Sequence, residues 1–280
     1  MFAERALGTR TPSELIWSVA LWTVMGLFVA NFMLMILAVL VNSFATQWFG
    51  TWLPPAFTTK WYVSAWREFQ LDQVLVVTMM VVGAVVVISG LIGVPAAYAL
   101  ARRNFPGKRF VLLLLLLPLM VPPITYGIPL ATVLYEARLA GNIWGVILAN
   151  LVPTVPFVVL VMIPFIEQID PRIEQAARLF GAGTGQLFVR VLVPLLAPGI
   201  LAALLLVLVR TIAMFELTFF TAGPSSQTLV VALYYAVYAP GVRANQSIDA
   251  MSIIYMATTL LWLMIALRFV NPVQLVGRPR

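Results

Sequence analysis

Residues 167–198, which read EQIDPRIEQAARLFGAGTGQLFVRVLVPLLAP, decide the fold class of this chain. They form a long polar interval between two strongly apolar segments, and they contain three of the chain's arginines, Arg172, Arg178 and Arg190. Asp170 is suited to cap a helix N-terminus, and Pro171 suits the first helical position, where no backbone donor is needed. The interval therefore predicts a short helix that begins at Pro171 and lies between two membrane spans.

This predicted helix has one apolar face made mostly of small residues. Its members recur at helical spacing over about three turns: Ile173, Ala176, Ala177 and Phe180. Three glycines then interrupt the helix: Gly181, Gly183 and Gly185. A second short helix is expected over residues 186–193, before Pro194. The pattern predicts a rigid projection on the membrane surface, with an ordinary solvated loop as the open alternative.

The composition is that of an integral membrane protein. Of the 280 residues, 62% are hydrophobic and 10% are charged, and the mean hydropathy is +1.01. A soluble domain of this composition would expose too much apolar surface. The absence of Cys and His excludes disulfides, thiol nucleophiles, imidazole bases and nearly all zinc chemistry, and no metal or cofactor is expected.

Six apolar segments reach the length of about 20 residues that crosses a bilayer as a helix. They are residues 15–41, 74–100, 110–134, 143–166, 198–222 and 249–270. The first segment is too long for a signal peptide and has no small-residue cleavage site, so it is expected to remain as a span. The chain is therefore predicted to be an all-α membrane protein with six transmembrane helices.

The basic residues predict the orientation of these spans. Four lie in the outer loops if the N-terminus is inside: Lys60, Arg67, Arg138 and Arg243. Twelve lie in the inner regions: Arg5, Arg10, Arg102, Arg103, Lys108, Arg109, Arg172, Arg178, Arg190, Arg268, Arg278 and Arg280. By the positive-inside rule, the tails at 1–14 and 271–280 and the interval 167–197 are cytoplasmic, and residues 15–270 form the transmembrane domain. Scattered at segment ends, the positive charges reflect topology and not a nucleic-acid surface.

The central interval resembles the EAA motif of ABC importer permeases, which reads Glu-Ala-Ala, three residues, Gly, nine residues, then Ile-x-Leu-Pro. Four positions match in register: Ala176, Ala177, Gly181 and Pro194. Three positions depart from the motif: Gln175 replaces the Glu, Val191 the Ile and Val193 the Leu. Glu174, one position upstream, is a candidate for the acidic role.

Three further stretches are similar to spermidine/putrescine-type permease subunits. They are FTTKWY at 57–62, PAAYALAR at 95–102, and FELTFFTAGP at 215–224. In the last stretch the acidic residue lies inside the pattern, and Arg210 precedes it. The resemblance implies a type I, MetI-like permease fold in a bacterial inner membrane, with residues 167–197 as the coupling region.

The resemblance also implies the partners and the solute. Such permeases work with ATPase subunits, a second permease of different sequence and an extracytoplasmic solute-binding protein. The residues expected to contact the ATPase are Arg172, Glu174, Gln175, Ala176, Ala177, Arg178, Gly181 and Pro194. The chain itself is expected to be a transport subunit and no enzyme, since it has no phosphate-binding Gly-x-x-x-x-Gly-Lys-Ser/Thr loop. A polyamine or related cation leads as solute, while iron, aminophosphonates, opines and sugars stay open.

Two charges, Arg210 and Glu216, lie well within the predicted fifth span. In one continuous helix they would point about 120° apart, so they would not form an i,i+4 pair. An ionisable residue in the membrane must meet protein or water, so each either pairs with a neighbouring helix or snorkels. Alternatively Glu216 faces a cationic solute on the substrate path, or the charges serve gating contacts. The residues expected along a substrate path are Tyr126, Asn150, Phe215, Glu216 and Phe219.

Four prolines in the third segment predict irregular backbone, either along a pathway or in a kinked packing helix: Pro118, Pro122, Pro123 and Pro129. Two other function classes stay open at this point. A gradient-driven carrier would need intramembrane ion relays and internal repeats, which are not evident. A membrane-embedded hydrolase or transferase would need a carboxylate pair or a Ser-Lys dyad, and Glu216 stands alone.

Overall fold

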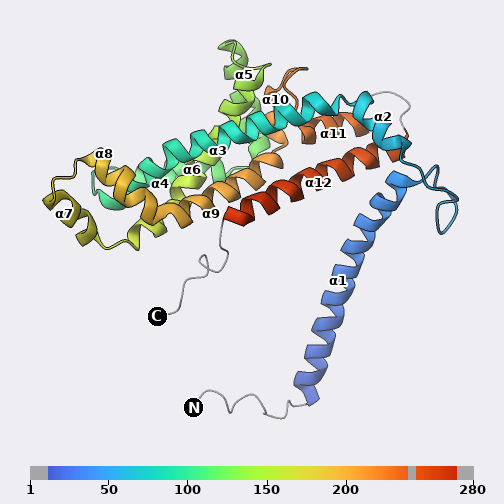
Figure 1. Cartoon of the computed structure of the whole chain (residues 1–280), viewed down its shortest axis with the longest axis horizontal. Helices are drawn as coiled ribbons and strands as arrows, with labels where there is room; N and C mark the ends of the chain where they lie inside the picture. The colour runs from blue at the N-terminus through green and yellow to red at the C-terminus, as the bar shows by residue number, and fades with distance from the viewer. Residues whose placement is uncertain (1–11, 239–243, 270–280) are drawn as a thin grey trace. The chain divides into compact units, whose positions relative to one another are not determined.

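The computed structural model describes residues 12–238 and 244–269, and these residues are mostly helical (Figure 1). Within these ranges the chain forms no strand, and its one extended pairing is an isolated antiparallel bridge between Ala45 and Phe57. The predicted tails lie outside the described residues, apart from residues 12–14 at the start of the first helix. Residue 270, the last of the predicted transmembrane domain, also lies outside them. Five basic residues of the charge count also lie outside them: Arg5, Arg10, Arg243, Arg278 and Arg280.

The helices follow one another along the whole described chain. Their bounds are α1 Pro12–Phe44, α2 Lys60–Glu68, α3 Leu71–Arg102, α4 Lys108–Met120, α5 Pro123–Glu136, α6 Ile143–Glu167, α7 Pro171–Leu179, α8 Thr184–Leu187, the π-helical turn η2 Phe188–Leu192, α9 Val193–Ile212, α10 Glu216–Thr221, α11 Leu229–Tyr238 and α12 Asn245–Phe269. Among the described residues, five helices are long and apolar enough to cross a membrane, or six if α4 and α5 are one broken span. The predicted six spans agree with the larger number.

The third predicted span is sharply bent. Helices α4 and α5 meet at an angle of 102°. Val121 and Pro122 between them have extended backbone, with ψ angles of 131° and 134°. A residue that precedes proline is driven toward this conformation, and here both Val121 and Pro122 precede one. The predicted irregular backbone is confirmed, and its cause is the Pro122–Pro123 pair.

The fifth predicted span has different bounds from those expected. The helical stretch begins at Thr184, not at residue 198, and it ends at Ile212. Pro194 does not separate two helices, because the wide π-helical turn Phe188–Leu192 directly before α9 accommodates the proline's missing donor. Residues 213–215 then break the chain before α10. The prediction of one continuous helix over 198–222 is therefore wrong.

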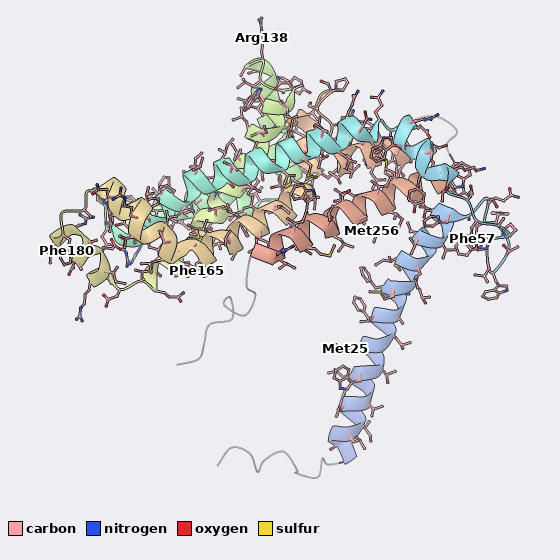
Figure 2. All side chains as sticks on the ribbon, viewed as in Figure 1. Met25, Phe57, Arg138, Phe165, Phe180 and Met256 are labelled. Atoms are coloured by element: carbon pink, nitrogen blue, oxygen red, sulfur yellow. The ribbon has the colours of Figure 1, made fainter. Side chains whose placement is uncertain are left out.

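The chain divides into two compact units. The first contains residues 1–64 and 243–253, and so includes α1, whose apolar side chains, such as that of Met25, project around the helix (Figure 2). Within this unit the Asn42 amide nitrogen donates to Asp249 Oδ2 over 2.5 Å, which ties the end of α1 to the start of α12. The exposed apolar surface of α1 is that of a helix that faces lipid or another subunit.

The second unit contains residues 65–242 and 254–280, and its core is a bundle of α3, α6 and α9. The three helices lie side by side in Figure 1. Buried aliphatic side chains fill the space between them, among them Val85, Val158, Met162 and Val207. The coupling region around α7 connects α6 to α9 of this bundle, and the stretch from Arg210 to Glu216 begins at the end of α9.

Candidate functional site

Helix α7 lies with α8 at one end of the α3–α6–α9 bundle (Figure 1). The predicted start of α7 is confirmed, because Pro171 is its first residue and the Asp170 side chain accepts a hydrogen bond from the Arg172 backbone N–H at 2.9 Å. Its end is also confirmed at the first glycine. Gly181 adopts φ +83° and donates its N–H to the Arg178 carbonyl oxygen at 3.0 Å, which closes the helix in a left-handed turn.

The side chains of α7 divide into exposed and inward-facing groups. Six residues expected to contact the ATPase are exposed: Arg172, Gln175, Ala176, Arg178, Gly181 and Pro194. Ala177 is half-buried and packs against the bundle core. The predicted single face of Ile173, Ala176, Ala177 and Phe180 is therefore split, since Ala177 faces the bundle and the other three face outward.

Two large apolar residues at the C-terminal end of α7 are almost fully exposed. Leu179 is 87% exposed and Phe180 is 93% exposed. Figure 2 shows Phe180 at the end of α7, on the side away from the bundle. Sequence reasoning placed Phe180 on the helix's apolar face but assigned neither residue to a partner. Two adjacent large apolar residues at the end of a polar, predicted cytoplasmic helix were the available signal.

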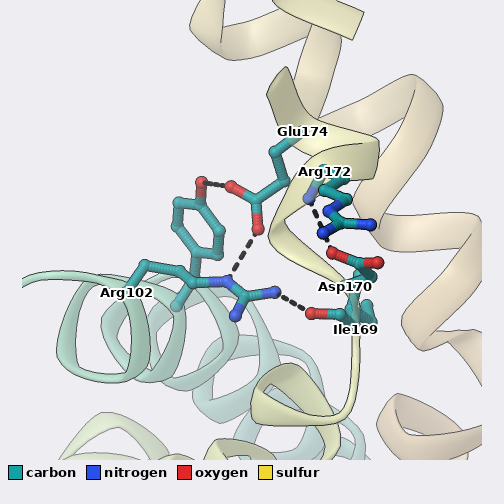
Figure 3. A network of polar contacts seen from close by, with 6 residues as sticks. Arg102, Ile169, Asp170, Arg172 and Glu174 are labelled. Atoms are coloured by element: carbon teal, nitrogen blue, oxygen red, sulfur yellow. Dashed lines mark hydrogen bonds and ion pairs between the residues drawn. The ribbon is translucent and has the colours of Figure 1, made fainter. Parts of the chain in front are cut away.

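Glu174 is the exception within the expected coupling set, because it is only 8% exposed. Its Oε1 pairs with Arg102 Nε at 2.7 Å, and its Oε2 accepts a hydrogen bond from the Tyr98 hydroxyl at 2.6 Å. Arg102 Nη2 also donates to the Ile169 carbonyl oxygen at 2.6 Å (Figure 3). Removing one partner of such a buried pair costs about 3–5 kcal/mol. The Glu174 carboxylate is therefore engaged by its own chain and is not presented outward.

A second candidate region surrounds the break between α9 and α10. Arg210 lies in the last turn of α9 and Glu216 is the first residue of α10. The expected 120° separation does not apply, because residues 213–215 interrupt the helix. A cation near the end of a helix is electrostatically favourable. The two charges therefore lie on successive helix ends at one break.

Aromatic residues of α5 and α6 lie beside this break. The Arg210 guanidinium carbon lies 5.4 Å from the Phe157 ring centroid, a cation–π contact. Tyr126 on α5 packs against the buried cluster that contains Met214 in the break and Leu217 in α10. Neither charge forms an ion pair with another residue of the described chain. The break thus carries two opposite, half-buried charges that are free to meet an outside group.

Aromatic rings from α10 and α11 form a continuous cluster beside this break. The Phe215 and Phe219 rings stack with centroids 5.1 Å apart, and Tyr234 lies 4.9 Å from Phe215 and 5.1 Å from Phe219. Tyr238 extends the cluster at 4.8 Å from Tyr234. Sequence reasoning found the two phenylalanines but missed the tyrosines, since it read residues 223–248 as an outer loop and not as a helix.

Asn150 and Tyr126 have different surroundings. Asn150 is buried in α6, where its Nδ2 donates to the Val146 carbonyl oxygen at 2.9 Å and to Thr218 Oγ1 at 3.2 Å. Its Oδ1 accepts no hydrogen bond from any of the described residues. Tyr126 is half-buried and lines an apolar cavity of about 420 Å³ at the α4–α5 bend. Of the expected path residues, Tyr126, Phe215, Glu216 and Phe219 gather at the break, while Asn150 supports α10 from within.

Known proteins are similar to this chain in sequence and in fold. Residues 89–273 match the family described as binding-protein-dependent transport system inner membrane component. The chain is 33% identical over 168 residues to a probable sulfate transport system permease protein of Chlorokybus atmophyticus, across 56% of this chain and 58% of that relative. It is 28% identical over 228 residues to the spermidine/putrescine transport system permease protein PotC of Escherichia coli strain K12, across 80% and 84%.

A solved structure extends the likeness to the fold. The crystal structure of a bacterial ABC transporter involved in the import of alginate superposes with a TM-score of 0.76 at 17% identity. The match covers 94% of this chain and 100% of that one. At this identity the likeness concerns the fold.

Proposed function

We propose, from the premise that this chain belongs to the family of binding-protein-dependent transport system inner membrane components, that α7 docks it to an ATPase subunit. The all-α, MetI-like permease fold expected from the sequence is confirmed by the family and the fold match. The chain is thus a multi-pass permease subunit of an ABC importer. In the proposal it lies in a bacterial inner membrane, pairs with a second, different permease, and receives its solute from an extracytoplasmic binding protein.

The observation that carries this proposal is the exposed end of α7, made by Leu179, Phe180 and the Gly181 turn. Large apolar side chains in this position need a partner surface. A short helix that inserts an aromatic residue into a groove is a recurrent mode of recognition. Arg178 lies in the last turn of α7, next to this end, and Arg172 lies in the first turn. Both are exposed and can supply polar contacts at the edge of such a groove. An ATPase subunit is the proposed occupant, because the chain carries no nucleotide-binding loop of its own.

Purification of the tagged full chain in a mild detergent tests the proposal. The expected result is co-purification of a second permease and of a subunit with a Gly-x-x-x-x-Gly-Lys-Ser/Thr loop, identified by peptide mass spectrometry. The complex should hydrolyse ATP, with stimulation by the loaded binding protein. A chain that purifies alone and takes up solute in proteoliposomes with an ion gradient and no ATP would be a secondary carrier instead.

The Gly181 turn provides a first mutational prediction. Its φ of +83° is strained for residues with a side chain, although a Cβ here would meet no atom within 4 Å. Gly181→Val should therefore reposition Phe180 and lower the recovery of the ATPase by about tenfold, which corresponds to 1.4 kcal/mol. Gly181→Asn is the control, since Asn tolerates left-handed backbone. Equal ATPase recovery with the Val variant and the wild type would contradict the docking role.

The substrate path is proposed to pass the α9–α10 break, with Glu216 and the Phe215–Phe219 stack as contacts for a cationic solute, a polyamine first. A carboxylate beside aromatic faces attracts cationic groups both by charge and by cation–π contact. Glu216→Gln should weaken the apparent affinity for putrescine in the reconstituted importer by about tenfold, because one counter-charge is lost. Glu136→Gln, an exposed carboxylate at the end of α5, should leave uptake unchanged.

Arg210 favours a second candidate solute, one that is acidic or carries both charges. The half-buried Arg210 guanidinium has no ion pair among the residues that the structure describes. Such a guanidinium repels a polycation and attracts an anion. Uptake of putrescine that does not change in Glu216→Gln would remove the cationic proposal. Uptake of sulfate or 2-aminoethylphosphonate that falls in Arg210→Gln would support the second candidate.

A further inference from the structure

We infer that Tyr98, Arg102 and Glu174 form a clasp that makes α7 move as one body with α3. The inference rests on the proposed function, in which an ATPase displaces α7. It goes further because it identifies the helix that receives the displacement and the side chains that transmit it.

The first support is that both oxygens of the Glu174 carboxylate are held by one helix. Tyr98 and Arg102 are four residues apart, so they lie on the same face of α3. Their donors reach Oε2 at 2.6 Å and Oε1 at 2.7 Å. Two short hydrogen bonds to the carboxylate, one of which is also an ion pair, restrict both its translation and its rotation. Glu174 is 8% exposed, so solvent screens the pair weakly.

The second support is that two further segments of the coupling region meet the same turn of α3. Arg102 Nη2 binds the Ile169 carbonyl oxygen at 2.6 Å, directly after the end of α6. The Tyr98 ring packs edge-on against Phe188, the first residue of η2, with centroids 5.8 Å apart. The entry to α7, the middle of α7 and the exit toward α9 are therefore all held by Tyr98 and Arg102 (Figure 3 shows the first two contacts).

The third support is the position of α3 in the bundle. Helix α3 packs closely on both α6 and α9: a Cβ on Gly93 would lie 2.7 Å from Val158 Cβ, and one on Gly90 would lie 2.9 Å from Leu204 Cδ2. A tightly packed helix transmits a rigid displacement with little loss. A movement that enters at α7 therefore reaches α3 through the clasp, and reaches α6 and α9 through α3. Without the clasp, α7 would depend mainly on its flanking chain segments.

Two conservative variants test the clasp in the reconstituted importer. Glu174→Gln removes the charge but keeps the side chain's shape, and Arg102→Gln removes both donors to Glu174 and Ile169. Each variant should retain the ATPase subunit and its ATP hydrolysis, while putrescine uptake per ATP hydrolysed falls at least about fivefold, the lower range of energetic coupling between sites. Matched controls are Glu167→Gln and Arg103→Gln, which remove the same charges from exposed neighbours and should behave as the wild type. Where putrescine is no substrate, the ratio of binding-protein-stimulated to basal ATP hydrolysis is the readout.

A charge-reversed pair, Arg102→Glu with Glu174→Arg, should recover part of the lost coupling, because Tyr98 can bond to either group. Recovery should be incomplete, since the Ile169 carbonyl would lose its donor. Unchanged coupling in Glu174→Gln would overturn the inference. Loss of the ATPase from that variant would also overturn it, by showing that the contact serves docking or folding alone. A wild-type chain that retains no ATPase would instead refute the proposed function itself.

Discussion

Phe180→Asp is expected to release the ATPase subunit from the permease. Phe180 is 93% exposed, so the change removes no contact within the chain, and folding should be unaffected. Aromatic residues at the centre of an interface contribute roughly 2–4 kcal/mol, and a buried, unpaired carboxylate adds to the cost. The affinity of the nanodisc-reconstituted permease for its ATPase should therefore fall by roughly 30-fold to 1,000-fold. Titration of labelled ATPase against the wild-type permease and against the Phe180→Asp variant measures this loss of affinity.

The matched control for this change is Phe105→Asp. Phe105 lies in the loop between α3 and α4, on the same predicted cytoplasmic side, and is 40% exposed. The two variants introduce the same charge, so a general effect of charge near the membrane would weaken both. ATPase binding that survives Phe180→Asp, or that falls equally in the two variants, would contradict the docking role of α7.

Gly223→Ala should strongly lower the stability of the folded chain. A Cβ at this position would lie 2.1 Å from the Gly141 carbonyl oxygen and 2.8 Å from the Gly141 carbonyl carbon. These are backbone atoms, and the Gly141 N–H is bound to the Thr221 carbonyl oxygen at 2.9 Å, so relief requires that this bond be disturbed. The combined overpacking and lost hydrogen bond cost about 3 kcal/mol or more.

The measurement for Gly223→Ala is the apparent melting temperature in detergent at a fixed scan rate, because membrane proteins often unfold irreversibly. A decrease of roughly 6–12 °C is expected for a unit of this size. Gly185→Ala is the control, since a Cβ there would meet no atom within 4 Å. Equal melting temperatures for Gly223→Ala and the wild type would mean that the two loops can separate without consequence.

Local sequence chemistry was sufficient to predict much of this fold. The length of the apolar segments gave the spans, because a helix must cross a fixed thickness of hydrocarbon. Asp170 and Pro171 gave the start of α7, and Gly181 its end, because caps and left-handed turns depend on a few adjacent residues. The bend at Pro122 and Pro123 was foreseeable for the same reason.

Features that depend on tertiary contacts could not be predicted in this way. The break between α9 and α10 contains no proline or glycine: residues 212–215 read IAMF, and Met214 is buried in a cluster with Leu217. Packing here overrides local helix preference. The clasp joins Glu174 to residues 72 and 76 positions away, a separation to which no spacing rule applies. Sequence reasoning therefore placed Glu174 outward, although the structure buries it.

The elbow between α4 and α5 has a consequence for backbone groups in hydrocarbon. A bend ordinarily strands amide hydrogens, each of which costs several kcal/mol away from water. At this elbow Pro122 and Pro123 have no amide hydrogen, the Val121 N–H is bound to the Leu117 carbonyl oxygen at 2.9 Å, and the Thr125 N–H is bound to the Pro122 carbonyl oxygen at 3.0 Å. Because these backbone groups are absent or already bonded, the bend needs few water molecules as hydrogen-bond partners. It can therefore lie among lipid acyl chains and does not have to border a water-filled pathway.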